Sequence, residues 1–297
     1  MGKINLSVIA IFHNMRREAS RTLRTLAQPY QLDVDTSEYE VIVVDNGSTE
    51  PLNPDWVHSF GRNFLYKRYD NNPTSPCWAI NQAVRESSGD IVMICIDGAR
   101  MLSPKILSLA KKALSINHNS FVYTLSLHLG PKLQSQSMLD GYNQAVEDEM
   151  LSHVNWTSRG YLLFNVASLG GSCLGGYYSP INESNCLSLR KNKYLEMGGY
   201  DENFLMGGGG LANLDFFERL HNENDLQPIL LLGEATFHQF HGGIASNATF
   251  STHPWKKMAA EYKLLRNKDY APIFRAPLYL GFMEEEAKFF IAKHSSV

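Results

Sequence analysis

The feature that most constrains this fold is a short, wholly apolar segment at residues 41–44, Val-Ile-Val-Val. Strands that are apolar at every position are typical of parallel sheets covered on both faces, whereas a half-exposed strand alternates apolar and polar residues. The segment ends at Asp45, Asn46, Gly47 and Ser48, a cluster typical of a turn. It therefore predicts a buried parallel strand with polar side chains at its carboxyl end.

Similar strands alternate with helices along the first 130 residues. Apolar, β-rich runs occupy residues 4–12, 91–96 and 121–127. Between them, residues 15–27 show helical spacing, and Ser-Pro pairs at 75–76 and 103–104 begin two further helices. This order favours an α/β fold, with a Rossmann-like, mostly parallel central sheet flanked by helices. Residues 130–185 are irregular, with one helix expected near 139–151, and the chain from residue 253 on is expected to be helical.

Composition excludes several classes of protein. A net charge of −3 provides no basic surface, so nucleic acid is not the expected partner. Four dispersed cysteines without a CxxC pair argue against a zinc ribbon or disulfide scaffold and fit the reducing cytoplasm. No apolar run approaches the ~20 residues that span a bilayer. We expect no transmembrane segment; peripheral membrane association stays open.

Polar residues follow three of the expected strands. The first strand ends at Phe12, His13 and Asn14, the second at Asp45, and the third is followed by Asp97 and Arg100. Ligands of open parallel sheets bind beyond these carboxyl ends. A carboxylate there can bind a ribose or base, and a carboxylate with an arginine can serve a diphosphate and its metal. Turn capping explains any one of these residues alone, but their convergence favours a nucleotide site.

The motifs, in their order, resemble those of the inverting glycosyltransferase family 2, which has the GT-A fold. They are residues 7–14 (SVIAIFHN), 39–48 (YEVIVVDNGS), 81–83 (NQA), 89–92 (GDIV), 186–190 (CLSLR) and 197–204 (MGGYDENF). The resemblance covers about residues 4–245. It implies transfer of a sugar from a nucleotide diphosphate, most often UDP, to a hydroxyl of a glycan or glycolipid acceptor, in polysaccharide or glycoconjugate synthesis.

The resemblance also implies a domain plan and a set of nucleotide-binding residues. We expect a transferase domain over residues 1–245, with a nucleotide-binding half (1–128) and an acceptor-binding half (129–245), followed by a C-terminal helical extension (246–297). The expected donor-binding residues are Ile11, Phe12, His13, Asn14, Asp45, Asn46, Asn81, Asp97, Arg100 and Arg190.

A divalent metal, Mn²⁺ or Mg²⁺, is implied at Asp97, which matches the first position of the family's Asp-x-Asp motif. The second position is Ala99, so one carboxylate is missing, and Arg100 can carry part of the phosphate charge. His238 and His241 are expected to complete the metal site with Asp97. The alternative is that both histidines are ordinary hydrogen-bonded side chains.

The general base is the second departure from the family. Its usual Glu-Asp pair reads Ala212-Asn213 here, after a run of four glycines, and an amide cannot accept the acceptor's proton. Asp215 is the expected replacement, although a carboxylate in a helix's first turn is also favoured by the helix dipole alone. A histidine of the 238/241 pair or Glu183 is the alternative.

Two other functions remain open. A catalytically weak homologue that only binds nucleotide sugars would explain Ala99 and Asn213. A nucleotidyltransferase ranks last, because residues 13–17 lack the glycine of a phosphate loop.

Overall fold

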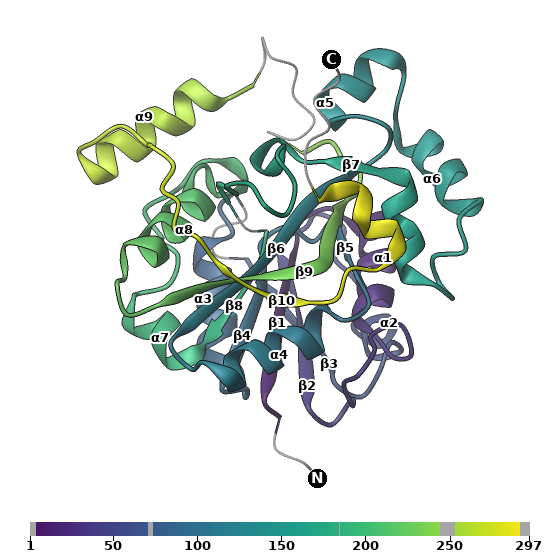
Figure 1. Cartoon of the computed structure of the whole chain (residues 1–297), viewed down its shortest axis with the longest axis horizontal. Helices are drawn as coiled ribbons and strands as arrows, with labels where there is room; N and C mark the ends of the chain where they lie inside the picture. The colour runs from purple at the N-terminus through teal and green to yellow at the C-terminus, as the bar shows by residue number, and fades with distance from the viewer. Residues whose placement is uncertain (1–3, 71–73, 184, 244–252, 292–297) are drawn as a thin grey trace.

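The computed structural model describes residues 4–70, 74–183, 185–243 and 253–291, and is built around one sheet (Figure 1). Its strands follow the order β10-β9-β6-β8-β4-β1-β2-β3, with β5 paired to β9 and β7 to β6. The strands are β1 (Leu6–Phe12), β2 (Tyr39–Asn46), β3 (Phe64–Tyr69), β4 (Ile91–Cys95), β5 (Arg100–Leu102), β6 (Ser120–Leu129), β7 (Ala167–Leu169), β8 (Cys186–Arg190), β9 (Gln227–His238) and β10 (Leu278–Gly281).

Helices cover both faces of this sheet (Figure 1). The α-helices are α1 (Arg16–Leu26), α2 (Pro54–His58), α3 (Cys77–Glu86), α4 (Ile106–Ile116), α5 (Gln134–Ser137), α6 (Gln144–Ser152), α7 (Lys191–Glu196), α8 (Ala212–Asn222) and α9 (Trp255–Arg266). Short 3₁₀ turns are η1 (Met138–Asp140), η2 (Gly160–Val166), η3 (Gly171–Cys173), η4 (Gly207–Gly209) and η5 (Glu285–Phe290). The predicted α/β fold, with its sheet between helical layers, is confirmed.

The apolar segment at the centre of the prediction lies in β2 and is buried along its whole length. Val41 and Val43 belong to the core that contains α1 and α4, whereas Ile42 and Val44 belong to the core that contains α3 and α8. Successive strand residues face opposite sides of a sheet, so a strand between two helical layers must be apolar at every position.

The direction of the strands sets the position of the site. β1 runs parallel to both β2 and β4, so their carboxyl ends meet at one edge, with Phe12 paired to Asp45. β8 runs antiparallel to both β4 and β6, which makes the sheet mixed. The last residue of β9, His238, pairs with Arg100 of β5. This pairing brings the late strand to the same edge as Asp97.

Two segments differ from their expected form. The helix expected over 139–151 begins only at Gln144, because Gly141 has a φ of 90° and Asn143 caps α6 through the amides of Ala145 and Val146. The C-terminal extension is helical in part. Its β10 returns to the sheet and pairs with β9, while α9 extends beyond the sheet near α8 (Figure 1).

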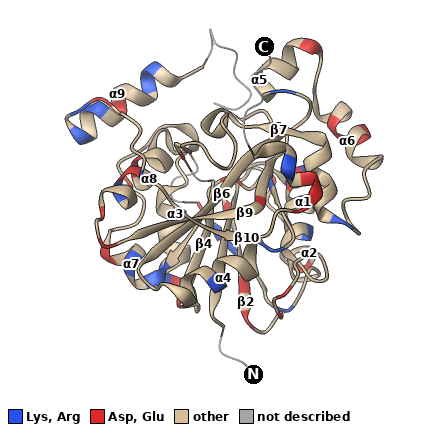
Figure 2. Cartoon of the chain, in the orientation of Figure 1, with Lys and Arg blue, Asp and Glu red and all other residues tan. Residues whose placement is uncertain are grey.

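Acidic and basic residues are interspersed over the helices and loops (Figure 2). This distribution agrees with the small net charge of −3.

Candidate active site

A cavity of about 1090 Å³ lies at the carboxyl ends of β1, β2 and β4. Several residues expected from the sequence line it: Ile11, Phe12, His13, Asn14, Asn46, Asp97, Arg100, His238 and His241. They come from segments more than 200 residues apart in the chain. The structure therefore brings most of the expected site residues together around one space.

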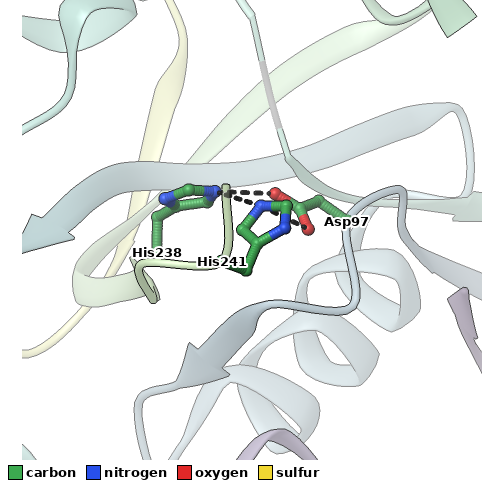
Figure 3. A group of neighbouring side chains, drawn as sticks. All are labelled: Asp97, His238 and His241. Carbon is green, nitrogen blue, oxygen red and sulfur yellow. Dashed lines mark hydrogen bonds and ion pairs between the residues drawn. The ribbon is translucent and has the colours of Figure 1, made fainter. Parts of the chain in front are cut away.

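Asp97, His238 and His241 form a compact group in this cavity (Figure 3). The Asp97 carboxylate lies 3.0 Å from Nε2 of His238 and 3.8 Å from Nε2 of His241. The two Nε2 atoms are 3.2 Å apart. One ligand atom from each side chain lies within 4.8 Å of the others, which is the spacing of groups that share a metal ion.

The surroundings of His238 select the form of imidazole that binds metals. Its Nδ1 lies 2.7 Å from Oε1 of Gln134, so Nδ1 carries the proton and Nε2 presents a lone pair to the group. The Gln134 amide donates in turn to the His238 carbonyl at 2.9 Å. Burial lowers the pKa of His238 to about 4, against the attraction of Asp97, so the ring is neutral. A neutral imidazole and a carboxylate fit a divalent cation.

Arg100 supplies fixed positive charge beside this group. Its side chain is buried, its Nη1 donates to Ser126 Oγ at 2.7 Å, and its Nε lies 3.6 Å from Asp97. Burial opposes ionisation of Asp97, but His241, His238 and Arg100 hold the pKa of this carboxyl well below its usual range. At Ala99, the position of the second aspartate in the family's motif, the backbone amide donates to Asp97 at 3.0 Å.

A glycine turn forms another part of the wall. Gly207, Gly208 and Gly210 line the cavity, and Gly208 and Gly210 have φ values of 68° and 55°. Residues other than glycine are strained at such positive φ values. Glycine at positions 208 and 210 is therefore required by the path of the backbone beside the cavity.

Three expected donor-binding residues lie outside the cavity lining and have partners within the fold. Asp45 is fully buried and accepts the amides of Ser48 and Leu52, both at 2.9 Å. Asn81 binds the chain near Tyr200, through its amide to the Tyr200 carbonyl at 2.8 Å. Arg190 ends the antiparallel β8 opposite Ile91, at the other edge of the sheet from Asp97. We therefore do not carry these three assignments into the proposed site.

Asp215, the expected base, also lies outside the cavity lining. It is 1% exposed, and its carboxylate is bound by Arg219 and Arg266. Asn213, two residues earlier, lines the cavity, and its amide donates to Glu183 at 3.1 Å. The structure thus places Glu183, and not Asp215, on the cavity wall.

Other residues of the site were not among those expected from the sequence. Ser126, His128, Gln136, Ser172 and Met258 line the cavity as well. No motif marked them in the sequence, because their meeting at the cavity depends on how β6, α9 and the segment 130–185 pack together.

Comparison with known proteins agrees with this geometry. Residues 7–132 match the family model described as Glycosyl transferase family 2. No curated protein is similar enough to this chain to be matched. Within the described residues, no helix is both long and apolar enough to cross a membrane.

Several solved structures share the fold. The S. aureus TarS 1–349 structure matches at a TM-score of 0.51 and 14% identity, over 80% of this chain but only 60% of that chain. Its complex with UDP-GlcNAc matches at 0.54 and 15% identity, over 88% of this chain and 67% of that chain. Mannosyltransferase PcManGT from Pyrobaculum calidifontis, in complex with GDP-Man and Mn²⁺, matches at 0.54 and 14%, over 92% and 67%. At these identities the likeness establishes the fold alone, which is GT-A.

Proposed function

We propose that this protein is a glycosyltransferase that uses a nucleotide sugar, with a UDP-sugar as the first choice of donor. The observation that carries the proposal is the meeting of the strand tips at Phe12, Asn46 and Asp97 with His238 and His241 around one cavity. Both the match over residues 7–132 and the GT-A fold support it.

The cavity wall offers separate surfaces for the parts of the donor. The backbone of residues 11–13 and the Asn46 side chain are suited to the base and ribose. Arg100 is buried and bound to Ser126, so its side chain is already fixed in place. Its positive charge would stabilise the diphosphate without a rearrangement of the side chain. Asp97, His238 and His241 are the residues that would hold a divalent cation, Mn²⁺ or Mg²⁺. When bound, such a cation supplies Lewis acidity toward the diphosphate leaving group.

The acceptor would enter on the side formed by residues 129–243. Gln136, Ser172 and Asn213 offer hydrogen-bonding groups on this part of the wall, as a sugar hydroxyl requires. We propose a glycan or glycolipid acceptor, reaction with inversion, and a role in polysaccharide or glycoconjugate synthesis. All four cysteines are buried, which fits work in the reducing cytoplasm.

A catalytically weak protein that only binds nucleotide sugars is the second candidate. It is favoured by Ala99 and Asn213, which replace two carboxylates that the family uses. The two candidates differ in whether nucleoside diphosphate is released when donor and acceptor are mixed.

Thermal unfolding in the presence of nucleotides tests the proposal. We expect UDP, UDP-GlcNAc or GDP-Man to raise the melting temperature more with Mn²⁺ than with EDTA, because a ligand of the native state stabilises it. An Asp97→Asn variant should lose the Mn²⁺-dependent part, whereas His153→Ala, on the exposed end of α6, should behave like the unmodified protein. If no nucleotide changes the melting temperature, the proposal is wrong.

A further inference from the structure

We infer that Glu183 is the general base of the proposed transfer, supplied by the loop before β8 in place of the carboxylate missing at position 213. The inference rests on the proposed function and assigns one further catalytic residue to it.

The first argument is position. Glu183 and Asn213 both line the cavity, and Nδ2 of Asn213 donates to Oε2 of Glu183 at 3.1 Å. Asn213 stands in the first turn of α8, directly after the glycine turn. The Glu183 carboxylate therefore lies one hydrogen bond from the place where the family carries its base.

A chain of hydrogen bonds links this carboxylate to the diphosphate end of the cavity. The Asn213 amide also lies 3.4 Å from Oδ1 of Asn185. Asn185 donates to Ser126 Oγ at 3.2 Å, and Ser126 accepts from Arg100 at 2.7 Å. Arg100 in turn lies beside Asp97, at 3.6 Å. Glu183 and Asp97 are thus joined through the partly buried Asn213 and the buried Asn185, Ser126 and Arg100, which fix their relative positions.

The presence of an amide at position 213 agrees with a general base at Glu183. Two carboxylates about 3 Å apart cannot both be ionised at ordinary pH, so one of them would hold a proton. An amide in the same place donates to the carboxylate and leaves it free to act as a base. A base at Glu183 therefore requires an uncharged hydrogen-bond donor beside it, and Asn213 is such a residue.

Three other titratable groups of the cavity, Asp97, His238 and His128, are less suited. Asp97 and Glu183 are the carboxylates among the described residues that line it, and Asp97 belongs to the group that faces the diphosphate. His238 is fully buried and is held by Gln134. His128 has a pKa well below its usual range because of burial, which weakens it as a base.

The chemical step balances with this residue. The acceptor oxygen attacks the anomeric carbon of the donor as its proton passes to the Glu183 carboxylate. The bond between the anomeric carbon and the β-phosphate oxygen breaks, and nucleoside diphosphate leaves with the bonding electrons. The protonated Glu183 then releases its proton to solvent.

Glu183→Gln tests the assignment, with Glu149→Gln on the exposed side of α6 as the matched control. The assay is release of nucleoside diphosphate from UDP-GlcNAc or GDP-Man, with p-nitrophenyl β-glycosides as acceptors. We expect Glu183→Gln to lower kcat by about 10²- to 10⁴-fold, the usual contribution of a general base. Its nucleotide-dependent rise in melting temperature should equal that of the unmodified protein.

A second variant separates a catalytic role from a structural one. Glu183→Gln combined with Asn213→Asp returns a carboxylate to the family's position. We expect the kcat of this double variant to be at least about tenfold higher than that of Glu183→Gln alone. A Glu183→Gln rate within threefold of the unmodified protein overturns the inference and leaves the proposed function standing. So does a loss of nucleotide binding that matches the loss of rate. If the unmodified protein neither binds nor turns over a donor, both fail.

Discussion

Arg266 of α9 binds Asp215 of α8 through two contacts, Nε to Oδ1 at 2.5 Å and Nη2 to Oδ2 at 2.9 Å. Arg219 donates to the same carboxylate at 2.9 Å. The Asp215 side chain is 2% exposed, so the carboxylate is buried, while its partners Arg266 and Arg219 are partly exposed. Asp215 thereby connects the C-terminal extension to the helix that carries Asn213.

Replacing Asp215 by alanine should therefore lower stability. The change removes the carboxylate that Arg219 and Arg266 share, and leaves Arg266 with its pair to Asp201 alone. Breaking a buried ion pair in this way costs about 3 kcal/mol in the free energy of unfolding, measured by urea titration. Asp269→Asn is the control, because its pair with Lys263 is exposed and should contribute less than about 1 kcal/mol. Equal losses in the two variants would contradict the structural role of Asp215.

Gln134 should control metal affinity although it is not itself a ligand. Its Oε1 accepts the Nδ1 proton of His238 and keeps Nε2 facing Asp97. Loss of such a partner lowers metal affinity by about 10- to 100-fold. We expect this for Gln134→Leu in Mn²⁺ titration calorimetry, with Gln82→Leu on α3 as the control. Unchanged affinity in Gln134→Leu would show that His238 does not bind the metal through Nε2.

Glu147 of α6 should support the same site from greater distance. Its Oε2 accepts the Phe240 amide at 2.8 Å, and Arg17, which pairs with Glu147, donates to the Phe240 carbonyl at 3.2 Å. Phe240 lies between His238 and His241, so both contacts fix the loop that carries His241.

Glu147→Ala should consequently lower Mn²⁺ affinity by about tenfold. Glu147→Gln, which keeps an oxygen for the Phe240 amide, should retain most of it. Asp148→Ala is the matched control, since Asp148 pairs with Arg17 from the exposed side of α6. The prediction fails if Asp148→Ala weakens Mn²⁺ binding as much as Glu147→Ala.

Glu234 of β9 should make stability depend on pH. It is fully buried among Ser103, Tyr161 and the Lys105 amide. Burial raises the pKa of Glu234 from 4.5 to about 7, although these hydrogen bonds oppose the shift. Between these values the folded protein keeps a proton that the unfolded chain has lost. Stability from this group is therefore present below pH 4.5 and falls as pH rises to 7, by on the order of 3 kcal/mol.

Glu234→Gln removes this titration. We expect the unfolding free energies of the two proteins, measured in urea at pH 5 and pH 8, to differ in their pH dependence by the amount given above. Comparing the two proteins at each pH cancels the other carboxylates, several of which act in the opposite direction. Parallel curves would mean that Glu234 is ionised in the folded protein throughout this range.

Patterns confined to neighbouring residues carried the prediction of the fold. The apolar run at 41–44 showed a strand covered on both faces, and the alternation with helices showed that β1, β2 and β4 run parallel. Parallel strands end at one edge, so the sequence also placed the strand ends near Phe12, Asp45 and Asp97 together, although Asn46 and not Asp45 lines the cavity. The helix expected near 139–151 was predicted to begin several residues before its observed start at Gln144. The break at Gly141 depends on a single backbone angle, which the sequence pattern did not indicate.

Contacts between distant segments were decided only by the tertiary structure. From sequence, Asp215 was the nearest carboxylate to the missing base, but packing of α9 places Arg266 on it and leaves Glu183 on the cavity wall. The sequence by itself determined the strands and their polar ends, because strand and helix periods are set by local backbone geometry. Which carboxylate faces the cavity depends on how loops and helices pack across the sheet, and the periodic pattern of neighbouring residues does not predict that packing.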